Sequence, residues 1–334
     1  ADIQVRDQIK SGKFQGPRLI ASGCGITVPE GHARLFAKKA TTPEEGRALV
    51  HEHFSNGADQ IKLFITGGVF DAEVEGEPGV LRMPLDIAQA VCDEAHKLGL
   101  RTSAESTEGV EVGLKAGVDT IEHGAPLTDE LLKLFKKNGL GNASSLTCTL
   151  SPALPFAVLS PEKTHSTHVQ KVNGRVVYEG VATATRQALA NGIPVGLGTD
   201  SACPFVTHYD MWREVVYFQR HTGVTPEFAL HTATLKNAQL LGVANETGSI
   251  ETGKSADLIV LDANPLDDLC ALRNVEQVFM AGKPVKYKAK HLPKIDAELD
   301  GIMDGIDNDP FVSEWNNAEE KKSFNPFAKR STKE

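Results

Sequence analysis

One junction recurs along the chain and constrains its fold more than any other feature. A stretch with helical periodicity stops at a residue followed by glycine, and a short β-branched run comes next. Glycine readily adopts the left-handed conformation that ends a helix, and the runs have the composition and length of buried parallel strands. Helix and strand therefore alternate. The junctions are Asn56-Gly57, Leu98-Gly99, Ala116-Gly117, Asn138-Gly139 and Asn191-Gly192.

Signals for helix starts lie between these junctions. Thr42, Pro43 and Glu45 form an N-cap, a first-turn proline and a capping-box glutamate, and Thr128 and Thr225 begin weaker versions. The repeated β-α unit predicts an α/β fold with a parallel sheet, either doubly wound or closed as a (β/α)8 barrel. No GxGxxG or GxxxxGKS loop follows any of the runs, which disfavours a nucleotide-dependent oxidoreductase on an open sheet.

Composition excludes several other classes. The 334 residues are 40% hydrophobic and 24% charged, which is ordinary for a globular protein. Lys and Arg number 35 against 44 Asp and Glu, so the net charge of −9 disfavours nucleic acid and anionic membranes as partners. No apolar run reaches the roughly 18 residues of a membrane span. The five cysteines are an odd number without a CxxC pair, which favours a reducing compartment and predicts a cytoplasmic protein.

The pattern changes after residue 245. Two strands are predicted at Asp257–Leu261 and Val275–Met280, joined by an Asn-Pro-Leu turn and a short helix. We expect three parts: a (β/α) barrel over 1–245, β strands over 246–290, and a polar, partly disordered tail over 291–334. The first residues read as a helix already under way, so we also expect the sequence to be truncated at its N-terminal side.

Three strand ends carry side chains suited to chemistry. Lys62 lies inside the run ADQIKLFITGG, His123 ends VDTIEHG, and Asp200 ends IPVGLGTD. The carboxyl ends of parallel strands form the active-site edge of such folds. Lysine, histidine and aspartate together suit zinc or a similar divalent ion. Taken singly, each has a structural alternative: a lysine that reaches solvent, a hydrogen-bonded core histidine, and a helix N-cap.

Five strings carry a resemblance to a known family: GADQIKLFITGGV, AGVDTIEHG, GIPVGLGTDS, HTATLKNAQLLG and GSIETGKSADLIVLDANPL. Over roughly residues 3–290 the chain resembles the metal-dependent amidohydrolase superfamily, in its imidazolonepropionase-like and Xaa-Pro or Xaa-Arg dipeptidase-like branch. The resemblance implies a (β/α)8 TIM barrel with a small β-sandwich near the C-terminus, built from both chain ends. It also implies that Lys62 is carbamylated by CO2 and bridges two zinc ions, with His123 and Asp200 as further ligands.

Two departures from the family pattern stand out. The HxH pair of the first strand has no counterpart, so the first strands are expected to be missing. His51 and His53 do not replace it, because they fall in a predicted helix where residues i and i+2 face different sides; we expect both at the surface. In the fifth strand, TSAES places Ser103 where the family has a histidine ligand and keeps Glu105 nearby. His96 belongs to the preceding helix.

Loop residues supply candidates for substrate binding. His32 follows the run RLIASG, and His208 follows Asp200, so both fall where barrel loops contact a substrate. Glu105 is a third candidate. His165 and His168 have the HxxH spacing of a helix-borne metal pair, but their polar flanks favour a long loop.

These observations predict a metal-dependent hydrolase of C–N bonds in a small amide, cyclic amide or dipeptide. One or two divalent ions, zinc first among them, would lower the pKa of a bound water and polarise the scissile carbonyl. Asp200 would then accept the proton of that water and return it to the leaving nitrogen. The alternative is a catalytically incomplete amidohydrolase fragment or pseudoenzyme that binds no catalytic metal. An exposed barrel edge would favour a homo-oligomer.

Overall fold

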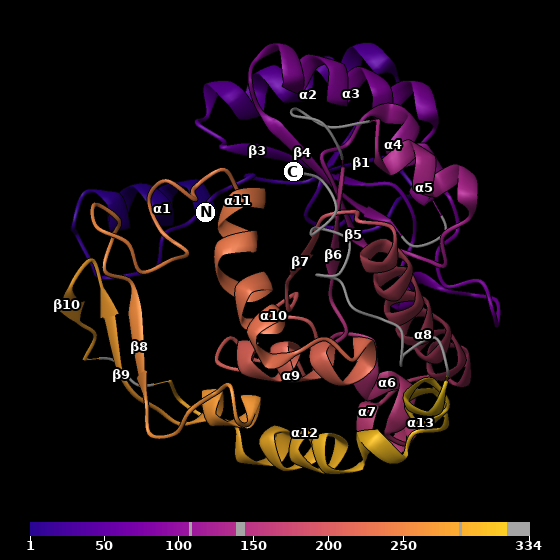
Figure 1. Cartoon of the computed structure of the whole chain (residues 1–334). Helices are drawn as coiled ribbons and strands as arrows, with labels where there is room; N and C mark the ends of the chain where they lie inside the picture. The colour runs from indigo at the N-terminus through magenta and orange to yellow at the C-terminus, as the bar shows by residue number, and fades with distance from the viewer. Residues whose placement is uncertain (107–108, 138–143, 287–288, 319–334) are drawn as a thin grey trace, which may run out of the picture.

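The computed structural model describes residues 1–106, 109–137, 144–286 and 289–318. Within these residues a seven-stranded sheet has the order β2-β1-β3-β4-β5-β6-β7, and every neighbouring pair is parallel. Figure 1 shows the sheet running through the centre of the molecule. The strands are β1 (Ile26–Thr27), β2 (Lys38–Lys39), β3 (Gln60–Phe64), β4 (Arg101–Ser106), β5 (Thr120–His123), β6 (Ser145–Cys148) and β7 (Val195–Leu197).

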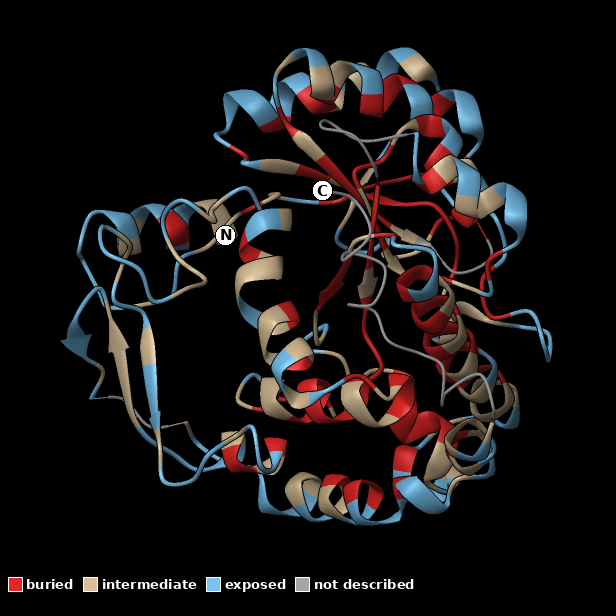
Figure 2. Cartoon of the chain, viewed as in Figure 1, coloured by how far each residue is buried: buried red, intermediate tan, exposed pale blue. Residues whose placement is uncertain are grey.

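Helices connect the strands and cover the sheet. One group lies along its outer side at the top of Figure 1, and the longest helix, α8, lies on another side beside β6. Figure 2 shows that the buried residues of these helices face the sheet. The first group comprises α2 (Pro43–Ser55), α3 (Leu85–Lys97), α4 (Val110–Ala116) and α5 (Asp129–Phe135). The others are α6 (Leu154–Val158), α7 (Pro161–Thr164), α8 (His168–Ala190), α9 (Met211–Thr222), α10 (Pro226–His231) and α11 (Asn237–Leu240).

The predicted class is confirmed: the fold is α/β, with a parallel sheet and strand–helix repeats of TIM-barrel type. Of the five predicted glycine junctions, four have left-handed glycines, and Gly139 lies outside the described residues. Thr42 caps α2 by accepting a hydrogen bond from the Glu45 backbone N–H at 3.2 Å. The left-handed glycines are Gly57, Gly99, Gly117 and Gly192, with φ between +70° and +90°.

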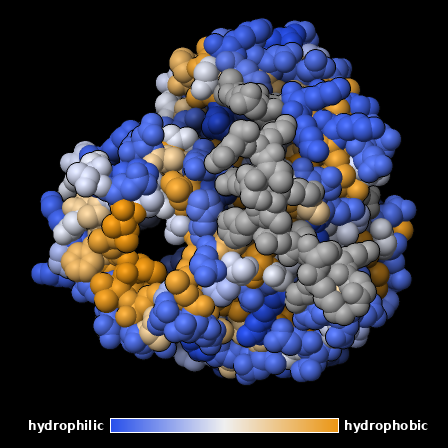
Figure 3. All heavy atoms as spheres, viewed as in Figure 1, coloured by the Kyte–Doolittle hydropathy of each residue, from blue (hydrophilic) through white to orange (hydrophobic). Residues whose placement is uncertain are grey.

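A second, smaller sheet stands apart from the first (Figure 1). It is antiparallel, with the order β10-β9-β8, and its strands are β8 (Leu258–Leu261), β9 (Val275–Met280) and β10 (Lys283–Pro284). Both predicted strands are confirmed to within a residue. In the part of the chain that is described, a single sheet occupies the place of the expected small β-sandwich. Hydrophobic side chains gather over this region of the surface in Figure 3.

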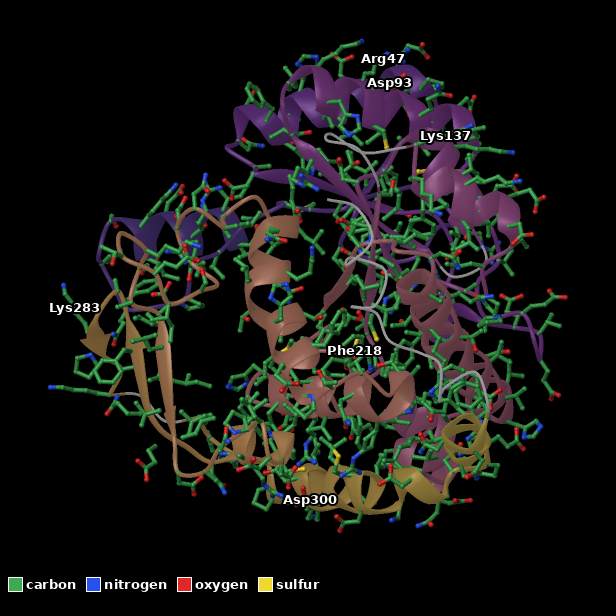
Figure 4. The ribbon with its side chains drawn as sticks, in the orientation of Figure 1. Arg47, Asp93, Lys137, Phe218, Lys283 and Asp300 are labelled. Carbon is green, nitrogen blue, oxygen red and sulfur yellow. The ribbon has the colours of Figure 1, made fainter. Side chains whose placement is uncertain are left out.

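The segment after residue 291 contains two helices, α12 (Pro293–Gly305) and α13 (Pro310–Asn317). Leu299, Ile302 and Val312 are buried, because these helices pack against α6 and α9. Asp300, labelled in Figure 4, accepts a hydrogen bond of 2.7 Å from Arg213 of α9. Residues 293–317 of the expected tail are therefore folded onto the barrel helices. The expected disorder falls on residues outside the described ranges, and the domain boundaries stay a prediction.

Within the described residues, no helix combines the length and hydropathy needed to cross a membrane. The interior is instead that of a layered domain. Phe218, labelled in Figure 4, is fully buried on α9 and stacks with Phe228 at a centroid distance of 6.5 Å. The N-terminal helix α1 (Asp2–Lys10) is attached through Arg6, whose guanidinium donates to Asp59 at 2.5 Å and to the Gly57 carbonyl at 2.7 Å.

The two histidines of the His-Glu-His triplet in α2 differ in their surroundings. His51 is exposed and contacts Glu94 at 2.9 Å, as expected for a surface residue. His53 is buried, so its predicted surface position is wrong. Its ring nitrogens lie 2.6 Å from the carbonyl oxygens of Leu49 and Cys24, which joins the helix to the segment before β1. Neither histidine lines the candidate site described below.

We predict that His53→Ala lowers the free energy of unfolding by roughly 2 kcal/mol, because it removes a buried side chain and leaves the Cys24 carbonyl without its imidazole partner. His51→Ala, two residues away on the same helix, is the matched control and should change stability by less than about 0.5 kcal/mol. Urea unfolding of both variants measures the difference. Equal effects would contradict the structural role assigned to His53.

Candidate active site

Side chains from several strand ends line one cavity of about 250 Å³. Lys62 comes from β3, Glu105 from β4, His123 from β5, and Asp200 follows β7. Parallel pairing brings these ends to one edge of the sheet, as predicted. His32, from the loop between β1 and β2, lines the same cavity. The structure thus brings together five of the six predicted site residues.

Lys62 lies among carboxylates inside the sheet. Its ammonium forms an ion pair with Glu122 and lies 3.9 Å from Glu105 Oε2, and 18% of its side chain is exposed. Burial lowers the pKa of Lys62, and the negative charges of Glu105 and Asp200 oppose that shift. The structural alternative of a lysine that extends into solvent is therefore wrong. Because its pKa is lowered, Lys62 loses its proton more readily than a surface lysine does.

His123 and Asp200 both have left-handed backbone conformations, with φ of 67° and 57°. Such conformations are costly for residues other than glycine and cluster at functional sites. In β5, side-chain alternation places Thr120 and Glu122 on one face of the strand. His123 would follow on the opposite face if the strand continued. At His123 the backbone instead adopts the left-handed conformation, and the side chain of His123 lines the cavity.

The position on β4 that lines the cavity is Glu105, one of the predicted substrate-binding residues, whereas Ser103 is not among the lining residues. Ser103 pairs with Lys62 across the two strands. It lies two residues before Glu105 and therefore on the same face of β4. It lines a different cavity of about 180 Å³, together with Thr120 and Thr147. A carboxylate, rather than a hydroxyl, therefore stands at the β4 end of the site.

His96 has a structural role, as its helical position suggested. Its Nε2 lies 3.0 Å from Oδ2 of Asp119, which is buried. The same carboxylate oxygen accepts hydrogen bonds from the Thr102 backbone N–H at 2.8 Å and from the Thr102 hydroxyl at 3.1 Å. These contacts join α3 to the beginnings of β4 and β5, away from the cavity.

His32 is held between two carboxylates. Its Nδ1 contacts Asp71, and its Nε2 lies 3.2 Å from Glu105 Oε1. Burial by itself would lower the pKa of His32, but the hydrogen bond to Asp71 and the charge of Glu105 outweigh it, so the pKa is raised. The contact with His32 likewise lowers the pKa of Asp71. The cationic form of His32 is thus favoured, with both ring nitrogens directed at carboxylates.

Three histidines of interest in the sequence lie elsewhere. His208 is exposed and packs its ring against Tyr209, so it is not among the residues that line the cavity. His165 ends α7 in a left-handed conformation, and His168 is the first residue of α8. The predicted long polar loop around these two residues is therefore wrong, because Thr167 and Gln170 form a complete capping box.

Sequence reasoning missed several residues of the site. Cys203 donates a hydrogen bond to Asp200 Oδ2 at 3.1 Å and lines the cavity. Glu122 and Asp71 pair with Lys62 and His32. Alternation from Thr120 could have indicated Glu122. The positions of Asp71 and Cys203 depend on loop conformations that carry no periodic signal.

Comparison with known proteins identifies the class. The model of the Amidohydrolase family matches residues 1–285. In structure, the chain is similar to a candidate prolidase from Bifidobacterium longum, with 43% identity, coverage of 90% of this chain and 74% of that one, and a TM-score of 0.84. It is also similar to a Xaa-Pro dipeptidase crystallised with bound methionine, with 30% identity, coverage of 86% and 72%, and a TM-score of 0.73.

The chain belongs to the amidohydrolase family, which confirms the resemblance noted in its sequence, including the branch of imidazolonepropionases and Xaa-Pro dipeptidases. It is also 25% identical over 314 residues to ochratoxinase of Aspergillus niger, covering 85% of this chain. The chain spans 63% of the length of that relative.

Amidohydrolases generally use a divalent metal, and the donor types of this site suit one. Glu105, His123 and Asp200 offer carboxylate and imidazole donors, the set that zinc-like ions accept. Across the described residues, no three His, Cys, Asp or Glu side chains are grouped closely enough to hold an ion. The Lys62 ammonium, paired with Glu122, lies among these donors. An ion therefore fits the site by donor chemistry and requires side chains to close around it.

A buried carboxylate supports the loop that borders the cavity. Glu214 of α9 is fully buried and accepts hydrogen bonds from the backbone N–H groups of Leu150 at 2.8 Å and Ser151 at 2.9 Å. Pro152 and Ala153, the next residues, line the cavity. Burial raises the pKa of Glu214 to about 7, although these hydrogen bonds oppose the shift.

This raised pKa predicts a pH-dependent stability. Between about pH 4.5 and 7 the folded state keeps a proton on Glu214 that the unfolded state releases, so the free energy of unfolding falls as pH rises through this window. Glu214→Gln does not titrate, so its free energy of unfolding should fall less between about pH 5 and pH 8. Urea unfolding across this range measures the slopes, with exposed Glu130→Gln as control. Equal slopes for Glu214→Gln and the wild type would contradict the assignment.

Proposed function

We propose that this protein is a metal-dependent hydrolase of C–N bonds in small amides, cyclic amides or dipeptides. One observation carries the proposal: Lys62, Glu105, His123 and Asp200 come from four different strand ends and line the same cavity. Such convergence at the carboxyl ends of parallel strands is typical of catalytic sites on this fold. The family membership and the prolidase-like relatives support the same reaction type.

Asp200 is the proposed proton carrier. It is an exposed carboxylate at the cavity, and Cys203 holds its Oδ2 by a hydrogen bond. A carboxylate in this position can accept the proton of the attacking water and deliver it to the leaving nitrogen. His32, whose raised pKa keeps it cationic over a wider pH range than an ordinary histidine, contributes positive charge at the cavity while both of its ring nitrogens face carboxylates. Glu105 orients that imidazole through its Nε2.

The metal would be held by Glu105, His123, Asp200 and a carbamate on Lys62, with zinc as the first choice. A bound divalent ion supplies Lewis acidity, which lowers the pKa of water and polarises a carbonyl. The lowered pKa of Lys62 favours the carbamate, because only the neutral amine attacks CO2. Starting from the ammonium, two protons would leave: one to free the amine, and one as the N–C bond forms and a C=O π bond of CO2 opens, so that a cation among carboxylates becomes an anionic donor.

The cellular setting is part of the same proposal. All five cysteines are described, and all are free thiols, which supports a cytoplasmic protein. The net charge of −9 supports a small neutral or cationic partner rather than nucleic acid. Assembly into a homo-oligomer stays a prediction.

A second candidate is a chain that by itself holds no catalytic metal. The observation that favours it is the ion pair of Lys62 with Glu122, because a lysine held as an ammonium by that carboxylate does not form a carbamate donor. Elemental analysis separates the two candidates after dialysis against zinc and bicarbonate and removal of loosely bound metal. One or two ions per chain, lost in His123→Ala, support the hydrolase, whereas a metal-free chain supports the alternative.

We predict that Asp200→Asn lowers kcat for amide or dipeptide hydrolysis by at least roughly 100-fold, because an amide cannot carry the proton. The circular dichroism spectrum and the urea midpoint should stay close to those of the wild type, since the residue is exposed. Asp93→Asn, an exposed aspartate on α3 labelled in Figure 4, is the matched control. A variant that keeps most of its turnover would exclude Asp200 from this role.

Chemical rescue of Lys62→Ala tests the proposed carbamate. Activity should be lost, and it should return in part when a short carboxylate such as acetate or propionate is added with zinc. A carboxylate replaces the carbamate group, whereas an alkylamine replaces an ammonium. Rescue by ethylamine instead of propionate would show that Lys62 acts as a cation, and the carbamate would be withdrawn.

A further inference from the structure

The cavity of the candidate site has a wall that the proposed chemistry does not use. Beside the charged groups, its lining includes the phenyl rings of Phe36, Phe64 and Phe70, and the Phe64 ring centroid lies 5.1 Å from the Lys62 ammonium and 5.6 Å from the His32 ring. We call these three residues the aromatic rim. The rings come from the β1–β2 loop, from β3, and from the short helix η1 (Val69–Asp71) that follows β3. Val69 and Val177 extend the same apolar surface.

The rim leaves large apolar side chains in water. Phe36 is 70% exposed and Phe70 is 43% exposed. Exposed phenyl groups at the mouth of a cavity stabilise a complex when an apolar group of a ligand covers them. By contrast, the largest aromatic side chains of the core, such as Tyr178 and Phe218, are fully buried. Within the rim, Phe36 and Phe70 therefore offer exposed apolar surface to a ligand, whereas Phe64 is largely buried.

Edge-to-face contacts hold the rings in place. Phe36 meets Phe64 at a centroid distance of 6.4 Å and an interplanar angle of 83°. Phe70 meets Phe156 at 5.2 Å and 88°, and Phe156 in turn meets Phe205 at 6.4 Å. Such arrangements orient aromatic rings. Each exposed ring of the rim is therefore packed against another aromatic side chain.

The backbone of the β1–β2 loop also fixes Phe36. Ala33 has a left-handed conformation with φ of 59°. Its carbonyl accepts hydrogen bonds from the backbone N–H groups of Phe36 at 3.0 Å and Ala37 at 2.9 Å. A tight turn with a strained alanine therefore carries Phe36 at the cavity mouth, and His32 of the same loop faces the charged side.

Charge and size narrow the ligand further. Among the described residues that line the cavity, the only lysine or arginine is Lys62, which is already paired with Glu122. His32, whose pKa is raised, is likewise held between Asp71 and Glu105, so these described lining residues offer no unpaired cation to an acidic side chain. The volume of about 250 Å³ falls below the roughly 300–1,000 Å³ of typical ligand pockets, which favours a dipeptide or an N-acyl amino acid over a longer peptide.

We infer that the aromatic rim binds an aromatic or large aliphatic side chain of the substrate and so determines specificity for apolar amino-acid amides. The specificity of hydrolysis rests on the proposed function, whereas the binding of an apolar side chain rests only on the lining of the cavity. The side chain lies on the phenyl rings while the amide faces Asp200 and His123. Removal of one ring takes away apolar contact area and lowers the preference for apolar substrates.

The test compares kcat/KM for glycyl-phenylalanine, phenylalanyl-glycine, glycyl-leucine, glycyl-glycine and glycyl-arginine, using the zinc-loaded full chain. We expect the phenylalanine or leucine substrates to exceed glycyl-glycine by roughly 10- to 100-fold. Phe36→Ala and Phe70→Ala should reduce this ratio by about tenfold, and Phe70→Leu should keep part of it. Phe54→Ala, which removes a 46% exposed phenylalanine of α2, is the matched control.

A binding measurement separates this inference from the proposed hydrolysis. Calorimetry compares N-acetyl-phenylalaninamide with N-acetylglycinamide on the wild type and on Phe36→Ala. Selective binding of the phenyl compound, lost in Phe36→Ala, supports the rim even if no substrate is hydrolysed, an outcome that would overturn only the proposed function. Hydrolysis without preference for apolar substrates, or with preference for glycyl-arginine, overturns the rim and leaves the hydrolase in place.

Discussion

The parallel register of β3, β4 and β5 is the constraint on which the rest of the site depends. Phe64 pairs with Glu105, and Glu105 pairs with Glu122, so residues 41 and 17 positions apart in the chain lie on adjacent strands at one level. Because parallel strands all end at the same edge, each strand–helix repeat delivers one more side chain to that edge. A one-residue shift would turn these side chains to the other face of the sheet.

The register of these strands also places carboxylates around the buried ammonium of Lys62. An ammonium inside a sheet is costly unless carboxylates surround it, and Glu105, Glu122 and Asp200 supply three. The same burial that demands these partners lowers the pKa of the amine, which prepares it for modification. Under the proposed function, a carbamate would turn this buried cation into an anionic metal donor, which would link the stability of the sheet to the proposed metal site.

The two walls of the cavity come from different parts of the fold. Strand ends supply the charged wall, where backbone pairing sets positions to within a residue. Loops supply most of the aromatic wall, through the turn at Ala33 and the helix η1. On folds of this type, catalytic groups tend to be fixed by the scaffold and substrate contacts by the loops. The division between reaction and specificity in our proposals follows this physical division.

Much of this protein could be predicted from its sequence. Glycine junctions and capping threonines act through local backbone geometry, so the alternation of helix and strand, and with it the α/β class, was determined by residues close together in the chain. The same alternation places Lys62, His123 and Asp200 at strand ends. Their convergence followed from the fold class, without any knowledge of individual contacts.

Tertiary structure alone decided the rest, because it depends on contacts between distant segments. His53 and His51 look equivalent in sequence, yet only His53 meets the Cys24 carbonyl and is buried. Glu105 was a candidate from the sequence, but its partners His32 and Lys62 come from other strands and loops and follow only from the folded chain. The aromatic rim is assembled from loops without periodicity. Local propensity therefore determined the elements of this protein, and packing between them determined which side chains share a site.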